Sequence, residues 1–159
     1  MKKVMVTIIW GVNGFYIVDF LHENESYNSS YFCEHILYKL YAMKDDIWPE
    51  SDEKKIWLHL DNCRVHNSKV TLAKTEEYGF KRTPHPAYSP DIALSAFFLF
   101  GYMKEMLKGS SFKSLDDLKE RIHEILSKIS REIRVSVFEE WIQRCELVIE
   151  QKGEYILKD

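Results

Sequence analysis

The sequence has few of the features that mark membrane, secreted or glycine-loop proteins. No apolar run approaches the roughly 20 residues that a membrane-spanning helix needs. The three cysteines are far apart and form no C-x-x-C pair, so we expect reduced thiols in an intracellular protein. The sequence has only six glycines, which is few for a protein with glycine-rich loops. It has no G-x-S-x-G elbow, Walker loop or Rossmann fingerprint. These absences argue against hydrolase-triad, nucleotide-kinase and dehydrogenase chemistry.

The composition is that of one folded domain. Hydrophobic residues make up 45% and aromatic residues 14% of the 159 residues, which is enough to bury a core and excludes a disordered tail. A net charge of −3 argues against coating nucleic acid through bulk charge. Residues 19–55 are acidic, whereas residues 62–109 carry seven basic against four acidic side chains. A solvated helix face explains such a basic block more often than a binding surface does.

The hydrophobic pattern predicts an α/β domain with a mixed sheet. Strands are expected at residues 4–10, 15–21, 56–60 and 80–83, the first two joined by a hairpin at Asn13-Gly14. Helices are expected over about 32–40, 67–78 and 99–107, the last two ending near Gly79 and Gly109. The Ser114/Asp117 and Ser136/Glu139 capping boxes predict two further helices. Residues 45–55 and 84–90 are expected to be loops, and the polar stretch 22–30 to supply helix caps.

Asp61 is the first candidate for chemistry because it directly follows a predicted strand. Ligands gather at the carboxyl ends of strands in α/β sheets, and a carboxylate there suits a hard cation such as Mg²⁺. The alternative is that Asp61 only caps the next turn. His59, Asp61, Cys63 and His66 lie within eight residues, but this spacing fits no usual zinc pattern and we expect no zinc site. His66 is expected to form a hydrogen bond or contact phosphate instead.

Two more candidates lie in the proline-rich stretch that follows. His85 stands between two prolines and is expected to be structural. Asp91 is expected to be a turn and helix-cap residue. A rival hypothesis, an unrelated metal phosphohydrolase, requires Asp61 and Asp91 to share a metal ion.

Two central motifs resemble the Tc1/mariner and IS630-type transposases, members of the DDE superfamily of endonucleases. WLHLDNCRVHNS (residues 57–68) is similar to that family's strand followed by Asp-Asn-x-x-x-His. HPAYSPDIALSAFFLFGYMKEMLKG (residues 85–109) is similar to its H-P-P-Y-S-P-D-L-A-P-S-D segment. Residues 3–21 and 141–156 resemble a flanking strand and the C-terminal helix, so the likeness covers nearly the whole chain.

The resemblance implies an RNase H-like fold in which three acidic residues hold two divalent ions, Mg²⁺ or Mn²⁺. These ions activate water and then a DNA 3′-hydroxyl for attack on phosphodiesters in transposition. Asp61 matches the second catalytic acid and metal ligand. The third acid follows after a spacer of thirty-four residues, and that position is Ala96. The first acid lies on a strand before residues 4–10, which is missing from this sequence together with the helix-turn-helix domains.

The resemblance therefore implies a single-domain fragment of a transposase, truncated at its N-terminus and inactive as this chain. Residues 1–112 would form the RNase H-like core and residues 113–159 two extra C-terminal helices. The implied partners are transposon-end DNA and either a second copy or a full-length transposase, in the nucleoid and cytoplasm or in the nucleus, with no membrane contact. The expected DNA-binding residues are Arg64, His66, Lys69, Lys81 and Arg82. The alternative is a non-catalytic remnant that binds DNA or a transposase.

Overall fold

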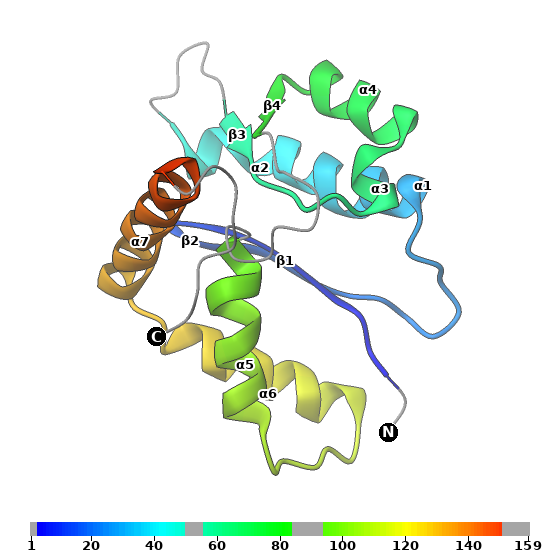
Figure 1. Cartoon of the computed structure of the whole chain (residues 1–159). Helices are drawn as coiled ribbons and strands as arrows, with labels where there is room; N and C mark the ends of the chain where they lie inside the picture. The colour runs from blue at the N-terminus through cyan, green and yellow to red at the C-terminus, as the bar shows by residue number, and fades with distance from the viewer. Residues whose placement is uncertain (1–2, 50–55, 84–93, 151–159) are drawn as a thin grey trace. The chain divides into compact units, whose positions relative to one another are not determined.

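The computed structural model describes residues 3–49, 56–83 and 94–150 (Figure 1). The chain divides into two compact units, residues 3–87 and residues 88–159, and each is described by itself. The proposed loop at 50–55, the proline-rich stretch, His85 and Asp91 lie outside the described residues. None of the helices in the described ranges is both long and apolar enough to cross a membrane. The division of a single domain near residue 112 stays a prediction.

The first unit begins with an antiparallel hairpin of β1 (Val6–Gly11) and β2 (Gly14–Phe20). The hairpin is confirmed, but its turn lies one residue earlier than predicted because Gly11 pairs with Gly14. Gly14 has a φ of 154°, so its conformational freedom is used at the start of β2. The pairing shifts between Ile9 and Trp10, and this irregularity places Trp10 opposite Phe15. The two rings stack at 5.7 Å, a cross-strand contact that favours this register.

One long helical segment follows the hairpin: α1 (Ser29–Tyr31), η1 (Phe32–Leu37) and α2 (Tyr38–Ile47). Asn28 caps it by accepting a hydrogen bond from the backbone N–H of Tyr31, as the polar stretch predicted. The η1 segment is a π-helical turn. The prediction of a loop from residue 45 was wrong at its start, because the helix continues to Ile47. Ile47 and Trp48 pack on the core there, and this burial favours the extra turn.

A parallel ladder joins β3 (Ile56–Leu58) to β4 (Phe80–Arg82). β3 is shorter than predicted, so Leu60 and Asp61 lie beyond its end. Between the strands, α4 (Lys69–Glu77) matches the helix predicted over about 67–78, whereas α3 (Arg64–Asn67), separated from it by a break at Ser68, was not predicted. Ser68 causes the break, because its extended backbone and its hydroxyl, which accepts from the N–H of Thr71, cap α4. Gly79 follows α4 with a φ of +79°, as predicted.

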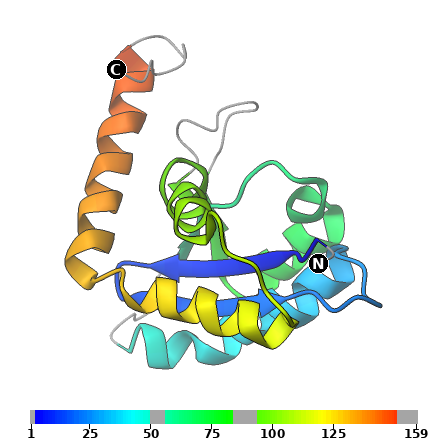
Figure 2. The same cartoon turned by 90° about the horizontal axis from the view of Figure 1, so that it is seen from below.

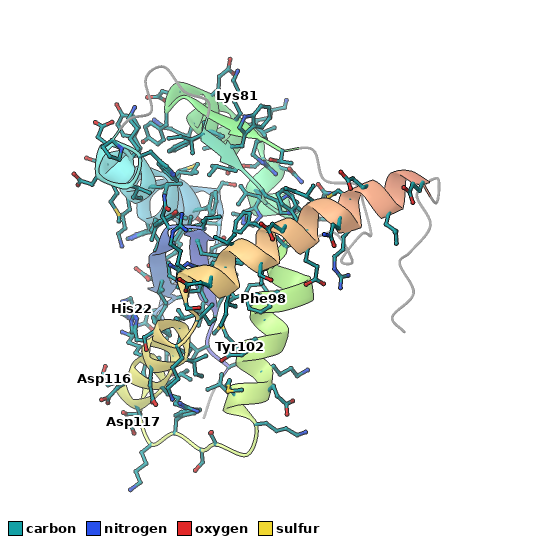
Figure 3. The ribbon with its side chains drawn as sticks, turned by 90° about the vertical axis from the view of Figure 1, so that its left-hand side faces the viewer. His22, Lys81, Phe98, Tyr102, Asp116 and Asp117 are labelled. Carbon is teal, nitrogen blue, oxygen red and sulfur yellow. The ribbon has the colours of Figure 1, made fainter. Side chains whose placement is uncertain are left out.

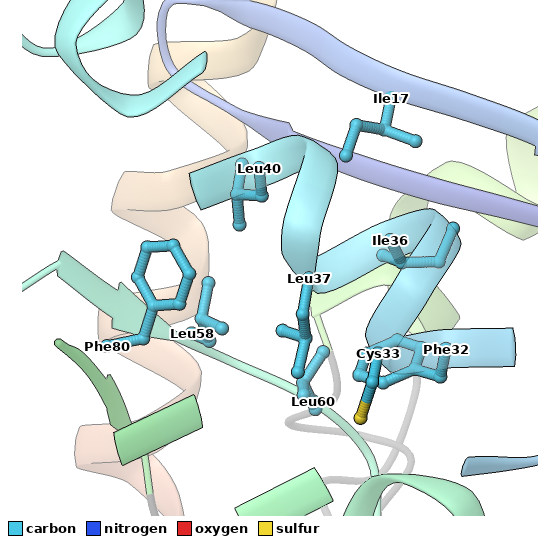
Figure 4. Close-up of a cluster of buried hydrophobic side chains, with 9 residues drawn as sticks. All are labelled: Ile17, Phe32, Cys33, Ile36, Leu37, Leu40, Leu58, Leu60 and Phe80. Carbon is cyan, nitrogen blue, oxygen red and sulfur yellow. The ribbon is translucent and has the colours of Figure 1, made fainter. Parts of the chain in front are cut away.

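The core of the first unit lies on both sides of η1 and α2 (Figure 4). Ile17 of β2 packs on one side of this helical segment, while Leu58 and Phe80 of the parallel ladder pack on the other. The helical residues at the centre are the most completely buried; they are Phe32, Ile36, Leu37 and Leu40. The two ladders are therefore held together through a shared helix, and among the described residues no hydrogen bond joins them into one sheet.

The second unit is helical throughout its described residues. Its elements are η3 (Ser95–Leu99), α5 (Phe100–Leu107), α6 (Leu115–Ser127) and α7 (Arg131–Glu150). Ser114 caps α6 as predicted, and Asp116 and Asp117 in its first turn complement the helix dipole (Figure 3). α7 leaves the turn after α6 at a steep angle (Figure 2). The Ser136 start was wrong: α7 begins earlier, where the hydroxyl of Ser130 accepts from the N–H of Ile133.

Candidate functional site

Asp61 lies beyond the last hydrogen-bonded position of the β3 ladder, at its carboxyl end, with 63% of its side chain exposed. Its Oδ1 accepts a hydrogen bond from the backbone N–H of Cys63 at 3.0 Å, which closes a tight turn. The prediction that the side chain of Asp61 caps the next turn is therefore confirmed. The same oxygen lies 2.8 Å from Nδ1 of His66, so the carboxylate contacts both the backbone of Cys63 and the imidazole of His66.

His66 is a largely enclosed polar side chain of this loop, with 13% of it exposed. Its ring packs on Phe32 with the centroids 4.7 Å apart, and its Nε2 lies 3.1 Å from the hydroxyl of Tyr27. Burial raises the pKa of Tyr27 to about 12, so this hydroxyl keeps its proton at neutral pH. Both ring nitrogens of His66 are thus engaged, which confirms the predicted hydrogen-bonding role.

Arg82 holds the same loop from the neighbouring strand β4. Its guanidinium donates to the carbonyl of His66 at 2.7 Å and to Oδ1 of Asn67 at 3.2 Å. Burial lowers the pKa of Arg82, while the charge of Asp61 opposes this shift. Two of its donors are committed to α3, so the structure gives Arg82 a positioning role in the loop.

A partly buried polar network anchors the α3–α4 junction to the start of α1. The hydroxyl of Ser29 donates to that of Ser68 at 2.7 Å, and Ser68 in turn donates to Thr71 at 3.0 Å. Thr71 is fully buried and donates to the carbonyl of Val65 at 2.6 Å. Because buried hydroxyls are costly unless paired, this network fixes α3, and with it His66, on the core.

Three of the predicted DNA-binding residues have exposed side chains on the first unit. Arg64 is the first residue of α3, Lys69 the first of α4, and Lys81 lies at the surface on β4 (Figure 3). These residues come from three successive elements, α3, α4 and β4. They stay predictions as DNA contacts, whereas His66 and Arg82 are used inside the loop.

Ala96 lies in the second unit, in the π-helical turn η3. The backbone N–H of Phe100 donates to the carbonyl of Ser95, which is the five-residue spacing of a π-helix. Such turns are rare and often lie at functional sites. The position for which the resemblance implies the third acid therefore has an unusual backbone, although alanine offers no ligand atom.

The structure also brings together three residues whose spacing in the sequence predicts no metal site. A ligand atom from each of Asp61, Cys63 and His66 lies within 4.8 Å of the others, and His59 is outside this group. Sequence reasoning missed Tyr27 and Phe32, which hold His66 in place. Tyr27 is 39 residues away from His66, and no local pattern reports such a contact.

Comparisons with known proteins find two similar curated proteins, although no protein-family model matches the chain. The human histone-lysine N-methyltransferase SETMAR is 29% identical over 157 residues, which is 97% of this chain and 22% of that protein. The Mariner Mos1 transposase of Drosophila mauritiana is 25% identical over 98% of this chain and 45% of its own length. The chain is homologous to Mos1 and SETMAR. The predicted Tc1/mariner resemblance is confirmed, and the link to IS630-type proteins stays a prediction.

The solved structures agree on the fold. The Mos1 catalytic domain with Mn superposes with a TM-score of 0.89 at 22% identity, covering 98% of this chain and 78% of that one. A Mos1 paired-end complex with the left transposon end gives 0.88 at 24% identity, covering 98% and 45%. The predicted RNase H-like α/β fold is thereby confirmed. The chain spans less than half the length of the two curated relatives.

The residues present do not fit the two-ion centre that the resemblance implies. Mg²⁺ and Mn²⁺ prefer several oxygen ligands, and carboxylates must converge to hold a pair of them. Asp61 supplies one carboxylate, and Ala96 supplies none at the position of the third acid. No reaction step through a pair of metal ions therefore follows from these residues.

Proposed function

We propose that this chain is part of the catalytic domain of a mariner-type DNA transposase. We propose further that the chain, as given, does not cleave DNA. The observation that carries the proposal is the homology to Mos1 over 98% of the chain, together with Asp61 at the end of β3 and alanine at position 96. The substrate class is transposon-end DNA. The partner is a second copy or a full-length transposase. The protein acts in the nucleoid and cytoplasm of a bacterial host or in the nucleus of a eukaryotic host.

A nicking assay tests the inactivity directly. The chain is incubated with supercoiled plasmid and with linear duplex in Mg²⁺ or Mn²⁺, next to the Asp61→Asn variant purified in the same way. We expect both proteins to give the same background, because Asp61 supplies one carboxylate and Ala96 supplies none, whereas a pair of ions needs several. Nicking by the chain that disappears in Asp61→Asn would overturn the inactivity.

A second experiment tests the origin of the chain. If the reading frame continues upstream of the Met1 codon into a strand that carries an acid, the longer protein with Ala96→Asp should excise a marked transposon. The longer protein with Ala96 unchanged is the control and should not. Equal excision by both proteins would show that position 96 carries no metal ligand and would contradict the assignment.

DNA binding without cleavage is the second candidate function, favoured by the exposed Arg64, Lys69 and Lys81 on α3, α4 and β4. This function requires that the affinity for DNA falls as the salt concentration rises and that binding needs no metal ion. The same purified chain can be tested for it, because retention on a DNA column depends on phosphate contacts alone.

A further inference from the structure

We propose that Asp61, Cys63 and His66 form a binding site for one zinc-class transition-metal ion. The ligands would be a carboxylate oxygen of Asp61, the thiolate Sγ of Cys63 and Nδ1 of His66, which lie within 4.8 Å of one another. In this group Asp61 supplies a single carboxylate, which does not suffice for two hard ions, but a sulfur and a nitrogen lie next to it. The site shares only Asp61 with the proposed function and uses neither Ala96 nor DNA.

The backbone brings the three ligands together within a single turn. Cys63 stands before the first residue of α3, and its carbonyl accepts from the N–H of His66 at 3.0 Å. Residues three apart on a helical turn lie on one face, so the thiol and the imidazole face the same side. The N–H of Cys63 also holds Oδ1 of Asp61 at 3.0 Å, which adds the carboxylate to that face.

The donor set decides the class of metal. Thiolate and imidazole ligands suit Zn²⁺ and Co²⁺, whereas Mg²⁺ binds oxygen and keeps much of its water. Metal–ligand distances of about 2.0–2.3 Å put neighbouring ligands of a tetrahedral ion roughly 3.3–3.8 Å apart. Oδ1 of Asp61 and Nδ1 of His66 are 2.8 Å apart without metal, so they must separate slightly as an ion enters. The exposed side chain of Asp61 leaves room for that movement.

The residues around His66 hold its imidazole in an orientation suited to metal binding. When Nδ1 binds a metal, the other ring nitrogen carries the proton and needs an acceptor, and the Tyr27 hydroxyl lies 3.1 Å from Nε2. The ring packs on Phe32, and Arg82 holds the backbone carbonyl of His66. The imidazole is therefore oriented before metal arrives. Three protein ligands leave a fourth position open to water or a substrate group.

The test uses Co²⁺ as a spectroscopic probe of the whole chain after removal of bound metals with a chelator. We expect one Co²⁺ per chain, with the visible bands of a tetrahedral site and a thiolate-to-cobalt charge-transfer band, both removed by added Zn²⁺. Cys63→Ser should lose the charge-transfer band, whereas Cys145→Ser, which removes another partly exposed thiol, should keep it. Tyr27→Phe should weaken Co²⁺ binding by about 10-fold or more.

Alkylation of the unmodified protein provides a second measurement that needs no variant. Zn²⁺ should protect Cys63 from a thiol reagent and leave Cys145 reactive, as read by mass spectrometry of peptides. A charge-transfer band that persists in Cys63→Ser, or equal alkylation of Cys63 with and without Zn²⁺, would overturn the site. Neither outcome bears on the transposase assignment, which the nicking and excision experiments test separately.

Discussion

Nδ1 of His66 lies 2.8 Å from Oδ1 of Asp61, and this contact joins the strand end to the first turn of α3. It fixes the direction of Asp61, the acid for which the resemblance implies a catalytic role. Because Tyr27 and Phe32 hold the far side of the same imidazole, the carboxylate is anchored through His66 to the core of the first unit. Asp61 is thus exposed and yet held in position, a combination that suits a ligand.

Neutralising the exposed basic residues should weaken DNA binding in a salt-dependent way. Removing one side chain that binds a phosphate reduces the slope of log affinity against log salt by about 0.9 on duplex DNA, so Arg64→Ala/Lys69→Ala/Lys81→Ala should reduce it by about 3. Fluorescence anisotropy from low to moderate salt measures the slope. The matched control removes three exposed charges from the second unit, Lys108→Ala/Lys113→Ala/Arg131→Ala. An equal effect of both triple variants would show that the binding follows net charge alone.

Arg82 and its neighbour Lys81 should respond differently to the same substitution. Arg82→Met removes two hydrogen bonds to α3 and should lower the free energy of unfolding by about 1–3 kcal/mol. Lys81→Met changes an exposed side chain and should stay within about 0.5 kcal/mol of the parent. Urea unfolding followed by circular dichroism measures both. Equal stability of the two variants would contradict a positioning role for Arg82.

Tyr31 should make the stability of the fold fall in alkaline solution. Its hydroxyl donates to Asp19 at 2.6 Å, and burial together with this bond raises the pKa of Tyr31 well above its ordinary value in the folded state. In the unfolded chain the phenol ionises near that ordinary value of about 10. The contribution of Tyr31 is therefore fully present below about pH 10 and is lost as the pH rises above it.

Tyr31→Phe isolates this contribution. The variant should be less stable than the parent at neutral pH by about 1.5–3 kcal/mol, because it loses a hydrogen bond to a carboxylate. The difference should shrink as the pH rises above about 10, when urea unfolding is measured for both proteins at each pH. A difference that is constant across this range would argue against a raised pKa of Tyr31.

Two serines with the same local sequence pattern should differ in their effect on stability. Ser114→Ala removes the cap of α6 and should cost about 1 kcal/mol of unfolding free energy. Ser136→Ala changes an exposed residue inside α7 and should cost nothing measurable. Thermal unfolding of the two variants provides the comparison. A larger loss in Ser136→Ala would indicate that α7 starts where its capping box predicted.

The parts of the fold that sequence reasoning found depend on strong local signals. Gly79 ends α4 with a positive φ, and Ser114 caps α6, because each residue suits that position in almost any surroundings. Ser136 shows the limit of such signals, since Ser-x-x-Glu also occurs inside a helix whose start is set by Ser130. The hairpin turn lies one residue earlier than the Asn13-Gly14 signal predicts, because the Trp10–Phe15 pair, and not the turn residues, determines the register of the strands.

The site was predictable only in part for a similar reason. Asp61 could be found from its place after a strand and from the resemblance to a family. Its neighbours could not, because Tyr27, which precedes α1, and Phe32 of η1 reach His66 only through tertiary packing. The π-helical turn that contains Ala96 also has no sequence signature of its own.

Mn²⁺ binding to Ala96→Asp tests the central claim most directly, since the resemblance implies a metal ligand at position 96. Titration of the purified chain should show Mn²⁺ affinity raised by about tenfold or more in Ala96→Asp, and this gain should vanish in Asp61→Asn/Ala96→Asp. Ser95→Asp adds the same charge one residue away and should give no such gain. Equal Mn²⁺ affinity of Ala96→Asp and Ser95→Asp, or a gain that survives Asp61→Asn, would contradict the assignment.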